Sequence, residues 1–366
     1  MIRYFKKAIP LSIIATGIMA SASFADTFTL RVGSGHPSKP TAYVTNMEKV
    51  LVPNIKKRVA AETNHKVRII EAYAGKIAKV HETLEAVEKG LLDIGSYCVC
   101  FETAKLLPWN FDYFVPFTTT NLVTNWEVKH KILKQYPQLT KMLEDKYNQK
   151  FLAMQGFDDY GIGTVKQWQK ASELKGVKVI AAGPNLPWVS LFGSIPVTST
   201  LPTMYNDLAT GVAKGVIIFP SAHAGGFKFY EQAPYWKVIG FGAMAQTITT
   251  INLDTMKKLP PEIVKIIMEE AVNYEKAAVI DGQRRYQKGL TDLVKLGKKK
   301  GINDAVTYLP VEQQKIWAET IKDWPNSRAK DITKDYGMDG AAIMNAYMDE
   351  MEKTGHKFPV RYKIGG

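Results

Sequence analysis

The chain has six histidines, whose side chains are the best suited to acid–base chemistry or metal binding. None has a partner at the spacing of a known motif. They are His36, His65, His81, His130, His223 and His356. A catalytic nucleophile needs a base positioned beside it, and the chain has neither a Gly-x-Ser-x-Gly elbow nor a phosphate-cradling loop. His81-Glu82-x-x-Glu85 imitates a zinc-binding helix but lacks a second histidine, so a solvated helix start is the better interpretation. We therefore expect no metal, no cofactor and no catalysis; an exported α/β enzyme acting on a small metabolite is the alternative.

Two further groups of residues resemble functional motifs but do not meet the requirements of those motifs. Gly33-Ser34-Gly35 follows an expected strand, but the third glycine of a dinucleotide fingerprint is absent and Pro37 interrupts the turn. Cys98 and Cys100 are the only cysteines, two positions apart on one face of an expected strand. We expect two buried free thiols there rather than a disulfide.

The composition describes a globular protein with a basic surface. The 366 residues are 46% hydrophobic and 23% charged, with 48 Lys and Arg against 35 Asp and Glu, a net charge of +13. These proportions exclude a disordered, collagen-like or coiled-coil chain, and the length suggests two domains. The lysines are scattered, with Lys298-Lys299-Lys300 the longest run and no interleaved aromatics, so we expect a solvated face and no nucleic-acid partner.

The first 25 residues predict export from the cytoplasm. Arg3, Lys6 and Lys7 precede an apolar stretch over 8–20, and Ser23-Phe24-Ala25 offers small residues for signal peptidase. A spanning helix needs about 20 apolar residues, so an uncleaved anchor is the weaker interpretation. We expect cleavage after Ala25, a periplasmic location and a mature net charge of +10.

Strands and helices alternate along the rest of the chain, which predicts two α/β lobes. Expected strands cover 27–33, 67–72, 91–101, 151–156, 176–181, 215–219, about 236–241 and 247–252. Expected helices cover 41–63 with a break at Pro53, 82–90, 203–210, 311–324 and 340–354. From Pro260-Pro261 about 40 residues run to Gly301 without a proline, which predicts one long helix bracing both lobes. Ligands of α/β sheets bind beyond the carboxyl ends of strands, so a cleft between the lobes should hold the ligand and close by a hinge motion.

Six short segments in this chain resemble a known protein family. They are 84–95 (LEAVEKGLLDIG), 112–117 with Val115-Pro116-Phe117, 173–178 (ELKGVK), 191–196 (LFGSIP), the helix around Tyr205-x-x-Leu208-x-Thr210-Gly211, and 256–264 (MKKLPPEIV). Together, in this order, they resemble the periplasmic solute-binding proteins of tripartite ATP-independent periplasmic (TRAP) transporters, of the dicarboxylate- and sialic-acid-binding type.

The resemblance implies a two-lobed periplasmic binding protein. Each lobe would be a mixed sheet flanked by helices, with the long helix bracing both. It also implies capture of a small organic solute and delivery to TRAP membrane permease subunits, without catalysis. We expect a monomer with a signal peptide over 1–25, an N-terminal lobe over 26–150 plus about 244–275, a C-terminal lobe over 151–243 plus about 276–310, and a C-terminal helical extension over 311–366.

The chain departs from the family pattern where the ligand's carboxylate is usually held. The resemblance places an arginine at Ile180 and often a second at Gly163, and the family's Asp-Gly near the third strand is Lys214-Gly215 here. Arginine pairs bidentately with carboxylates, so the usual clamp is missing. An organic acid remains the family default, held by Lys76, His36 and backbone N–H groups at helix starts.

The alternatives are an amine or quaternary-ammonium ligand, or a neutral one. Aromatic and carboxylate groups around 157–160 and 182–188 suit an organic cation, although Asp158 and Asp159 could equally be turn or cap residues. By position at strand ends, nine residues are predicted to bind the ligand: His36, Ser96, Tyr97, Asp159, Tyr160, Asn185, Trp188, Ser221 and His223.

Overall fold

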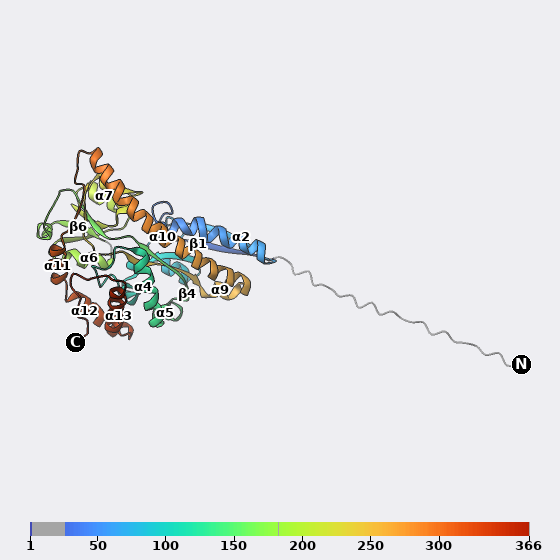
Figure 1. The fold of residues 1–366 in the computed structure, drawn as a ribbon. Coiled ribbons are helices and arrows are strands. Elements are labelled where there is room, and N and C mark those ends of the chain that lie inside the picture. Colours follow the sequence, from blue (N-terminus) through green and yellow to red (C-terminus); the bar gives the residue numbers. More distant parts are fainter. Residues whose placement is uncertain (2–25, 182, 366) are drawn as a thin grey trace.

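The structure is a computed structural model, and it describes residues 1, 26–181 and 183–365. The expected signal peptide lies outside the described residues. Among those described, no helix is long and apolar enough to cross a membrane. Two sheets, each covered by helices, form the two lobes, as expected (Figure 1).

The N-terminal lobe contains a five-stranded mixed sheet of order β2-β1-β3-β10-β4. Its strands are β1 (Thr27–Gly33), β2 (Lys66–Ala72), β3 (Ile94–Cys98), β4 (Gln149–Phe157) and β10 (Met244–Asn252). β1 pairs in parallel with β2 and β3, whereas β10 is antiparallel to both β3 and β4. Every residue of β3 and β10 is buried, because helices cover both faces of the sheet.

The C-terminal lobe contains a six-stranded mixed sheet of order β11-β9-β5-β8-β6-β7. Its strands are β5 (Gly161–Thr164), β6 (Lys178–Ala181), β7 (Ile195–Thr198), β8 (Gly215–Ile218), β9 (Tyr235–Val238) and β11 (Val306–Tyr308). β6 is parallel to β7 and β8, and β5 is antiparallel to β8 and β9.

The helices of the N-terminal lobe are α1 (Ala42–Asn46), α2 (Val52–Glu62), α3 (Thr83–Glu88), α4 (Leu122–Gln135), α5 (Gln138–Tyr147) and α9 (Leu253–Lys258). A π-helical turn over Met47–Leu51 joins α1 to α2. Pro53 lies directly after this turn, in the first turn of α2, and lacks the N–H that would bond back to it. The break expected at Pro53 is an altered turn and not an interruption of the helix.

The C-terminal lobe carries shorter helices: α6 (Leu186–Ser190), α7 (Met204–Ala209) and α8 (Pro220–Ala224). Two short 3-10 turns face each other across the lobes, over Val99–Glu102 and Gly183–Asn185. Others cover Leu107–Asn110, Ala171–Leu174 and Phe229–Glu231.

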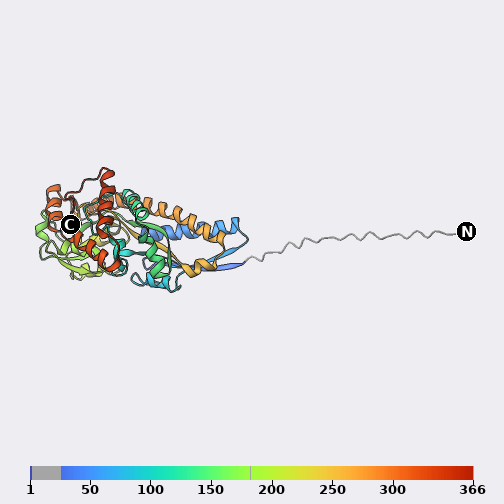
Figure 2. The same cartoon turned by 90° about the horizontal axis from the view of Figure 1, so that it is seen from below.

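Helix α10 (Pro261–Lys299) braces both lobes, as predicted from the proline-free run. It has 39 residues, about 58 Å at 1.5 Å per residue, and runs lengthwise from one lobe to the other (Figures 1 and 2). It packs against α1, α2 and β4 of the N-terminal lobe and against α8 of the C-terminal lobe. Gly289 permits the second contact, because a Cβ there would lie 2.6 Å from the carbonyl carbon of Pro220.

Two short backbone segments link the sheets directly, from strand to strand, and they bond to each other. Residues 158–160 connect β4 to β5, and residues 239–243 connect β9 to β10. The Asp159 carboxylate accepts a hydrogen bond of 2.9 Å from the backbone N–H of Gly242, whose carbonyl accepts one of 3.1 Å from Tyr160 N–H. These bonds tie the two connections together between the lobes.

The C-terminal extension contacts both lobes. It comprises α11 (Val311–Thr320), α12 (Trp324–Tyr336) and α13 (Gly340–Lys353). Trp317 of α11 donates from its indole nitrogen to the carbonyl of Trp188, at 2.7 Å, in the C-terminal lobe. Tyr347 of α13 accepts a 2.7 Å hydrogen bond from the amide of Asn125, on α4 of the N-terminal lobe.

One fully buried ion pair supports the N-terminal lobe. Lys129 on α4 lies 3.1 Å from the Asp112 carboxylate and also donates to the carbonyl of Trp109. Burial lowers the pKa of Lys129 and raises that of Asp112, and their mutual attraction opposes both shifts. One Asp112 oxygen has no hydrogen-bond partner among the described residues. Lys129 therefore supplies the side-chain contact that compensates the buried carboxylate.

The cysteine prediction was wrong. Cys98 and Cys100 form a disulfide, with Cα atoms 5.1 Å apart, and the described chain contains no free cysteine. The expectation of free thiols assumed that strand geometry continues to Cys100. The strand instead ends at Cys98, and the 3-10 turn over Val99–Glu102 brings the two sulfurs together.

Candidate functional site

A small cavity lies between the lobes, lined by side chains from both. Its lining residues are His36, Cys100, Phe101, Phe157, Tyr160, Asn185, Leu201, Met204, Ile217, Ile218 and Phe219. Several follow strands directly: His36 comes after β1, Phe101 after β3, and Phe219 after β8, while Phe157 is the last residue of β4. The cavity therefore lies where α/β sheets usually bind ligands, beyond the carboxyl ends of strands.

Aromatic rings make up much of the cavity wall. Phe157 and Phe219 stack at 4.7 Å with only 13° between their planes, and Tyr160 meets Phe219 edge-on at 5.7 Å. Phe101 lies 5.7 Å from the ring of His36. The space inside it that a water-sized sphere can occupy is about 20 Å³, little more than one water molecule needs. A larger ligand would therefore have to hold the lobes further apart than they are here.

His36 is the lining residue with a buried nitrogen left unpaired. Its Nδ1 lies 2.5 Å from the hydroxyl of Tyr43, and its side chain is only 2% exposed. The other ring nitrogen, Nε2, is buried without a hydrogen-bond partner among the described residues. Burial, with a smaller contribution from His81, lowers the pKa of His36 to about 4, so the ring is neutral near pH 7.

Glycines form two close contacts between the lobes, one of them next to the lining residue Cys100. A Cβ on Gly183 of the C-terminal lobe would lie 2.2 Å from the carbonyl oxygen of Cys100 in the N-terminal lobe. A Cβ on Gly226, just after α8, would lie 2.5 Å from Cβ of Pro40, in the loop before α1. The structure therefore shows the lobes in a closed arrangement that larger residues at these positions would obstruct.

Two buried carboxyl groups follow β4 and hold the hinge instead of lining the cavity. Asp158 accepts hydrogen bonds from the backbone N–H of Ser221, at 3.2 Å, and from its hydroxyl, at 2.8 Å. Asp159 accepts from Gly242 N–H. Burial raises the pKa of each carboxyl to about 7, and these hydrogen bonds oppose the shift. Their oxygens are thus engaged with Ser221 and Gly242.

Of the nine residues predicted to bind the ligand, His36, Tyr160 and Asn185 line the cavity. Asp159 and Ser221 lie in the hinge contacts just described. Ser96 and Tyr97 of β3 point into the N-terminal core: Ser96 accepts from the hydroxyl of Thr249, and Tyr97 donates to the amide oxygen of Gln149 at 2.8 Å. In this closed arrangement neither β3 residue lines the cavity.

Trp188 and His223 pack behind the cavity wall. The indole nitrogen of Trp188 donates to the carbonyl of Tyr113 at 3.0 Å, and its ring meets that of Tyr160 at 5.7 Å. His223 Nε2 pairs with the carbonyl of Ala233 at 2.8 Å, and burial lowers the pKa of His223 to about 4. The His223 ring also fills the space beside Gly163, where a Cβ would lie 2.3 Å from it.

The sequence analysis missed most of the apolar lining. Phe157 and Phe219 end or follow strands in the same way as the polar residues that were chosen, so position at a strand end could have identified them. Leu201, Met204 and Ile217 carry no such signal, because apolar residues of this kind usually belong to a core. Their place in the site depends on how the lobes meet.

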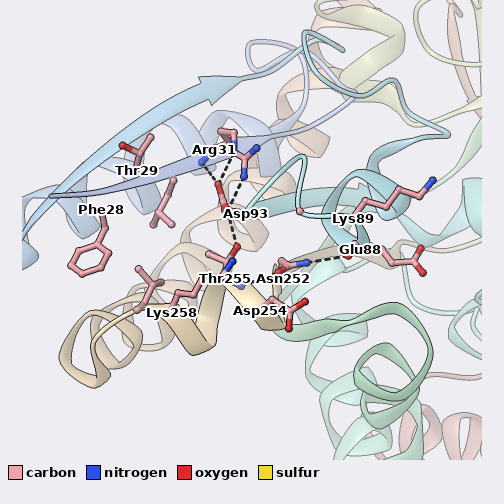
Figure 3. Close-up of a pocket in the computed structure, with 13 residues that line it drawn as sticks. Phe28, Thr29, Arg31, Glu88, Lys89, Asp93, Asn252, Asp254, Thr255 and Lys258 are labelled. Atoms are coloured by element: carbon pink, nitrogen blue, oxygen red, sulfur yellow. Dashed lines mark hydrogen bonds and ion pairs between the residues drawn. The ribbon is translucent and has the colours of Figure 1, made fainter. Parts of the chain in front are cut away.

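A second, larger cavity lies at the opposite end of the N-terminal lobe (Figure 3). It has a volume of about 390 Å³ and includes Arg31 and Asp93. These two form a salt bridge of 2.9 Å, and Thr255 donates to the same carboxylate at 2.7 Å. The cavity lies toward the amino-terminal ends of β1 and β3, and its central charges satisfy each other, so it is the weaker candidate. No group of metal-ligating residues occurs among the described residues.

Comparison with known proteins gives a family and a set of similar folds. The description "bacterial extracellular solute-binding protein, family 7" matches residues 42–325. No protein of curated function matches the sequence.

Similar solved structures share the fold at low identity. An extracytoplasmic solute receptor of Bordetella pertussis that binds pyroglutamic acid is 20% identical, with a TM-score of 0.71 over 87% of this chain and 99% of the receptor. A TRAP solute-binding protein of Rhodoferax ferrireducens with copurified benzoate is 18% identical, with a TM-score of 0.73 over 89% and 98%. The periplasmic ectoine-binding protein of a Halomonas elongata TRAP transporter is 17% identical, with a TM-score of 0.70 over 89% and 99%.

Proposed function

The chain belongs to the bacterial extracellular solute-binding proteins of family 7, and from this premise we propose that it closes its two lobes on a small organic solute and delivers it unchanged to a TRAP permease. The structural neighbours are TRAP solute receptors, as the resemblance seen in the sequence implied. Family and fold together establish a substrate-binding role. The site, the ligand and the partner in this chain are the proposal.

The observation that carries the proposal is the cavity between the lobes. Both lobes contribute to it, and it lies beyond the carboxyl ends of β1, β3, β4 and β8. The close contacts at Gly183 and Gly226 bring the lobes together around it. A ligand bound there would contact both lobes only in the closed state, so its binding energy would favour closure.

We propose that His36, Tyr160 and Asn185 contact the ligand, together with the aromatic lining. Asp159, Ser221, Trp188 and His223 would act indirectly, by holding the hinge and the wall of the cavity; Ser96 and Tyr97 would hold the sheet below. The neighbours named above bind pyroglutamic acid, benzoate and ectoine. These are small ring compounds, and a ligand of that size would hold the lobes further apart than they are here.

Location and assembly follow from the same role. The family is extracellular, and we propose that the first 25 residues direct the chain to the periplasm and are then removed. The binding unit would be a monomer, because the cavity is completed by the two lobes of one chain. The permease would recognise the closed lobes, the state in which the ligand is enclosed.

An exported enzyme would be the alternative of another class. Among the described lining residues, His36 is the one histidine, and none is a serine or threonine that could serve as a nucleophile. The proposal therefore predicts that a bound solute is recovered chemically unchanged.

A thermal-shift screen of the purified mature protein against small acids, amines and neutral metabolites tests the proposal. A ligand present at 100 times its dissociation constant should stabilise the folded protein by about 2.7 kcal/mol. Mass spectrometry of the released compound should return the input mass. A Phe157→Ala variant should lose the response, whereas a Thr255→Ala variant, altered in the cavity of Figure 3, should keep it. Stabilisation by no compound in a broad library, or turnover of a bound one, would refute the proposed role.

A further inference from the structure

The cavity between the lobes contains no formal charge among its described lining residues, and this constrains the ligand more than its size does. Seven of the eleven lining residues are Phe, Leu, Met or Ile, and none is Asp, Glu, Lys or Arg. A carboxylate or ammonium enclosed there would lose its water without gaining a partner of opposite charge. Burial of an unpaired ion is among the most costly events in a protein.

The positions from which a charge could reach the ligand are occupied by uncharged, well-packed groups. Ile180 is fully buried within β6. Gly163 has no side chain, and the ring of His223 fills the adjacent space. Asp158 and Asp159 direct their hydrogen bonds at Ser221 and Gly242. Among these described positions, none places a charged side chain against the cavity.

His36 lines the cavity with a buried ring nitrogen that has no partner among the described residues, and its neighbours determine which nitrogen carries the proton. Ser34 is buried, its oxygen accepts from the backbone N–H of His36, and its hydroxyl has one acceptor among the described residues, the Tyr43 oxygen at 3.4 Å. Ser34 thus donates to Tyr43, and Tyr43 donates to His36 Nδ1 at 2.5 Å. With Nδ1 accepting, the neutral imidazole carries its proton on Nε2.

The proton on Nε2 has no acceptor within the described chain. Nδ1 faces Tyr43, so Nε2 lies on the other side of the ring, which also packs near Phe101 and Phe157 of the cavity wall. A buried donor without a partner costs stability, and an oxygen atom of a ligand would satisfy it.

We propose, building on the solute-binding role above, that the part of the ligand entering this cavity is uncharged and that its carbonyl or ether oxygen accepts a hydrogen bond from His36 Nε2. Phe157, Phe219 and Tyr160 would pack around this group. Ser34 and Tyr43 act as positioning residues, because they fix the orientation and the tautomer of His36 without touching the ligand.

Four compounds of nearly equal shape isolate charge and hydrogen bonding. Acetophenone is neutral with an acceptor oxygen, α-methylstyrene is neutral without one, benzoate is an anion and benzamidine is a cation. Isothermal calorimetry should show acetophenone binding at least tenfold more tightly than α-methylstyrene. It should bind at least a hundredfold more tightly than either ion.

Variants of His36 separate the hydrogen bond from the shape of the cavity. His36→Phe keeps a ring and removes the donor, so acetophenone should lose its tenfold advantage over α-methylstyrene. His36→Gln offers an amide donor in its place and should retain part of that advantage. Tyr43→Phe leaves Nδ1 without its donor and should weaken acetophenone while leaving α-methylstyrene unchanged.

The outcomes distinguish this inference from the solute-binding role. Tightest binding of benzoate or benzamidine would overturn the inference and leave the role intact. So would binding of none of the four when another metabolite of the library binds. An advantage of acetophenone that survives in His36→Phe would overturn the assignment of His36 as the donor.

Discussion

Gly226→Ala should weaken ligand binding without altering any residue of the cavity. In the closed arrangement its Cβ would lie 2.5 Å from Cβ and 3.2 Å from Cα of Pro40, on the other lobe. The φ angle of Gly226 is outside the left-handed region, so alanine introduces no backbone strain. The conflict therefore exists only when the lobes are closed, and the variant should favour the open state.

Overpacking of this kind costs about 1–3 kcal/mol. Gly226 is exposed on the rim, where the loop can shift, so we expect the lower end of this range. A penalty of about 1 kcal/mol on the closed state weakens affinity roughly fivefold, and 1.4 kcal/mol weakens it tenfold. The free energy of unfolding should change little, because the open state still folds without the contact.

Calorimetry with the tightest compound of the screen gives the affinity, and small-angle X-ray scattering gives the closed fraction. Pro40→Gly removes the atom nearest the new methyl group, so the double variant should regain most of the lost affinity. Gly215→Ala is the matched control: its Cβ would meet Thr164, at 3.3 Å, within the same lobe. Affinity of Gly226→Ala equal to that of the unmodified protein, with an unchanged scattering profile on ligand addition, would refute closure through this contact.

Three other predictions concern stability and covalent structure. Lys129→Met leaves the Asp112 carboxyl buried and unpaired, so urea unfolding should show a loss of about 3–5 kcal/mol, mostly recovered when Asp112→Leu is added; equal losses in the single and double variants would argue against the pair. Burial raises the pKa of Asp159 to about 7, so its contribution to stability is present below pH 4 and is lost as the pH rises through 7. The melting temperature of Asp159→Asn should therefore fall less between pH 5 and pH 8 than that of the unmodified protein. Equal falls in the two proteins would contradict this. Thiol titration of the denatured, unreduced protein should detect no free thiol, since Cys98 and Cys100 are paired; two titrated thiols per chain would contradict the disulfide.

The regular elements were predictable where hydrophobic periodicity is strong. The strand over 27–33 has the predicted bounds, and the expected 40-residue helix is α10. No element was predicted over 122–147, although α4 and α5 lie there. Their apolar positions are interrupted by lysines and asparagines, including the buried Lys129, whose stability in the core depends on the distant Asp112.

The site was predictable only in part, because strand ends indicate an edge of the sheet but not the direction of each side chain. His36 and Tyr160 face the cavity. Ser96 and Tyr97 lie in the third strand, yet their side chains turn into the N-terminal core. The departure at Ile180 was visible in the sequence. Its consequence, a cavity without charge, required knowing which side chains the two lobes bring together.

Hydrogen–deuterium exchange with and without a saturating ligand tests the central claim most directly. Closure around a bound solute predicts slower exchange in segments of both lobes at once, around His36 and Phe101 in one and around Phe157–Tyr160 and Phe219 in the other. The segments around Arg31 and Thr255, in the cavity of Figure 3, should be unaffected. Protection confined to a single lobe, or centred on Arg31 and Thr255, would contradict the account.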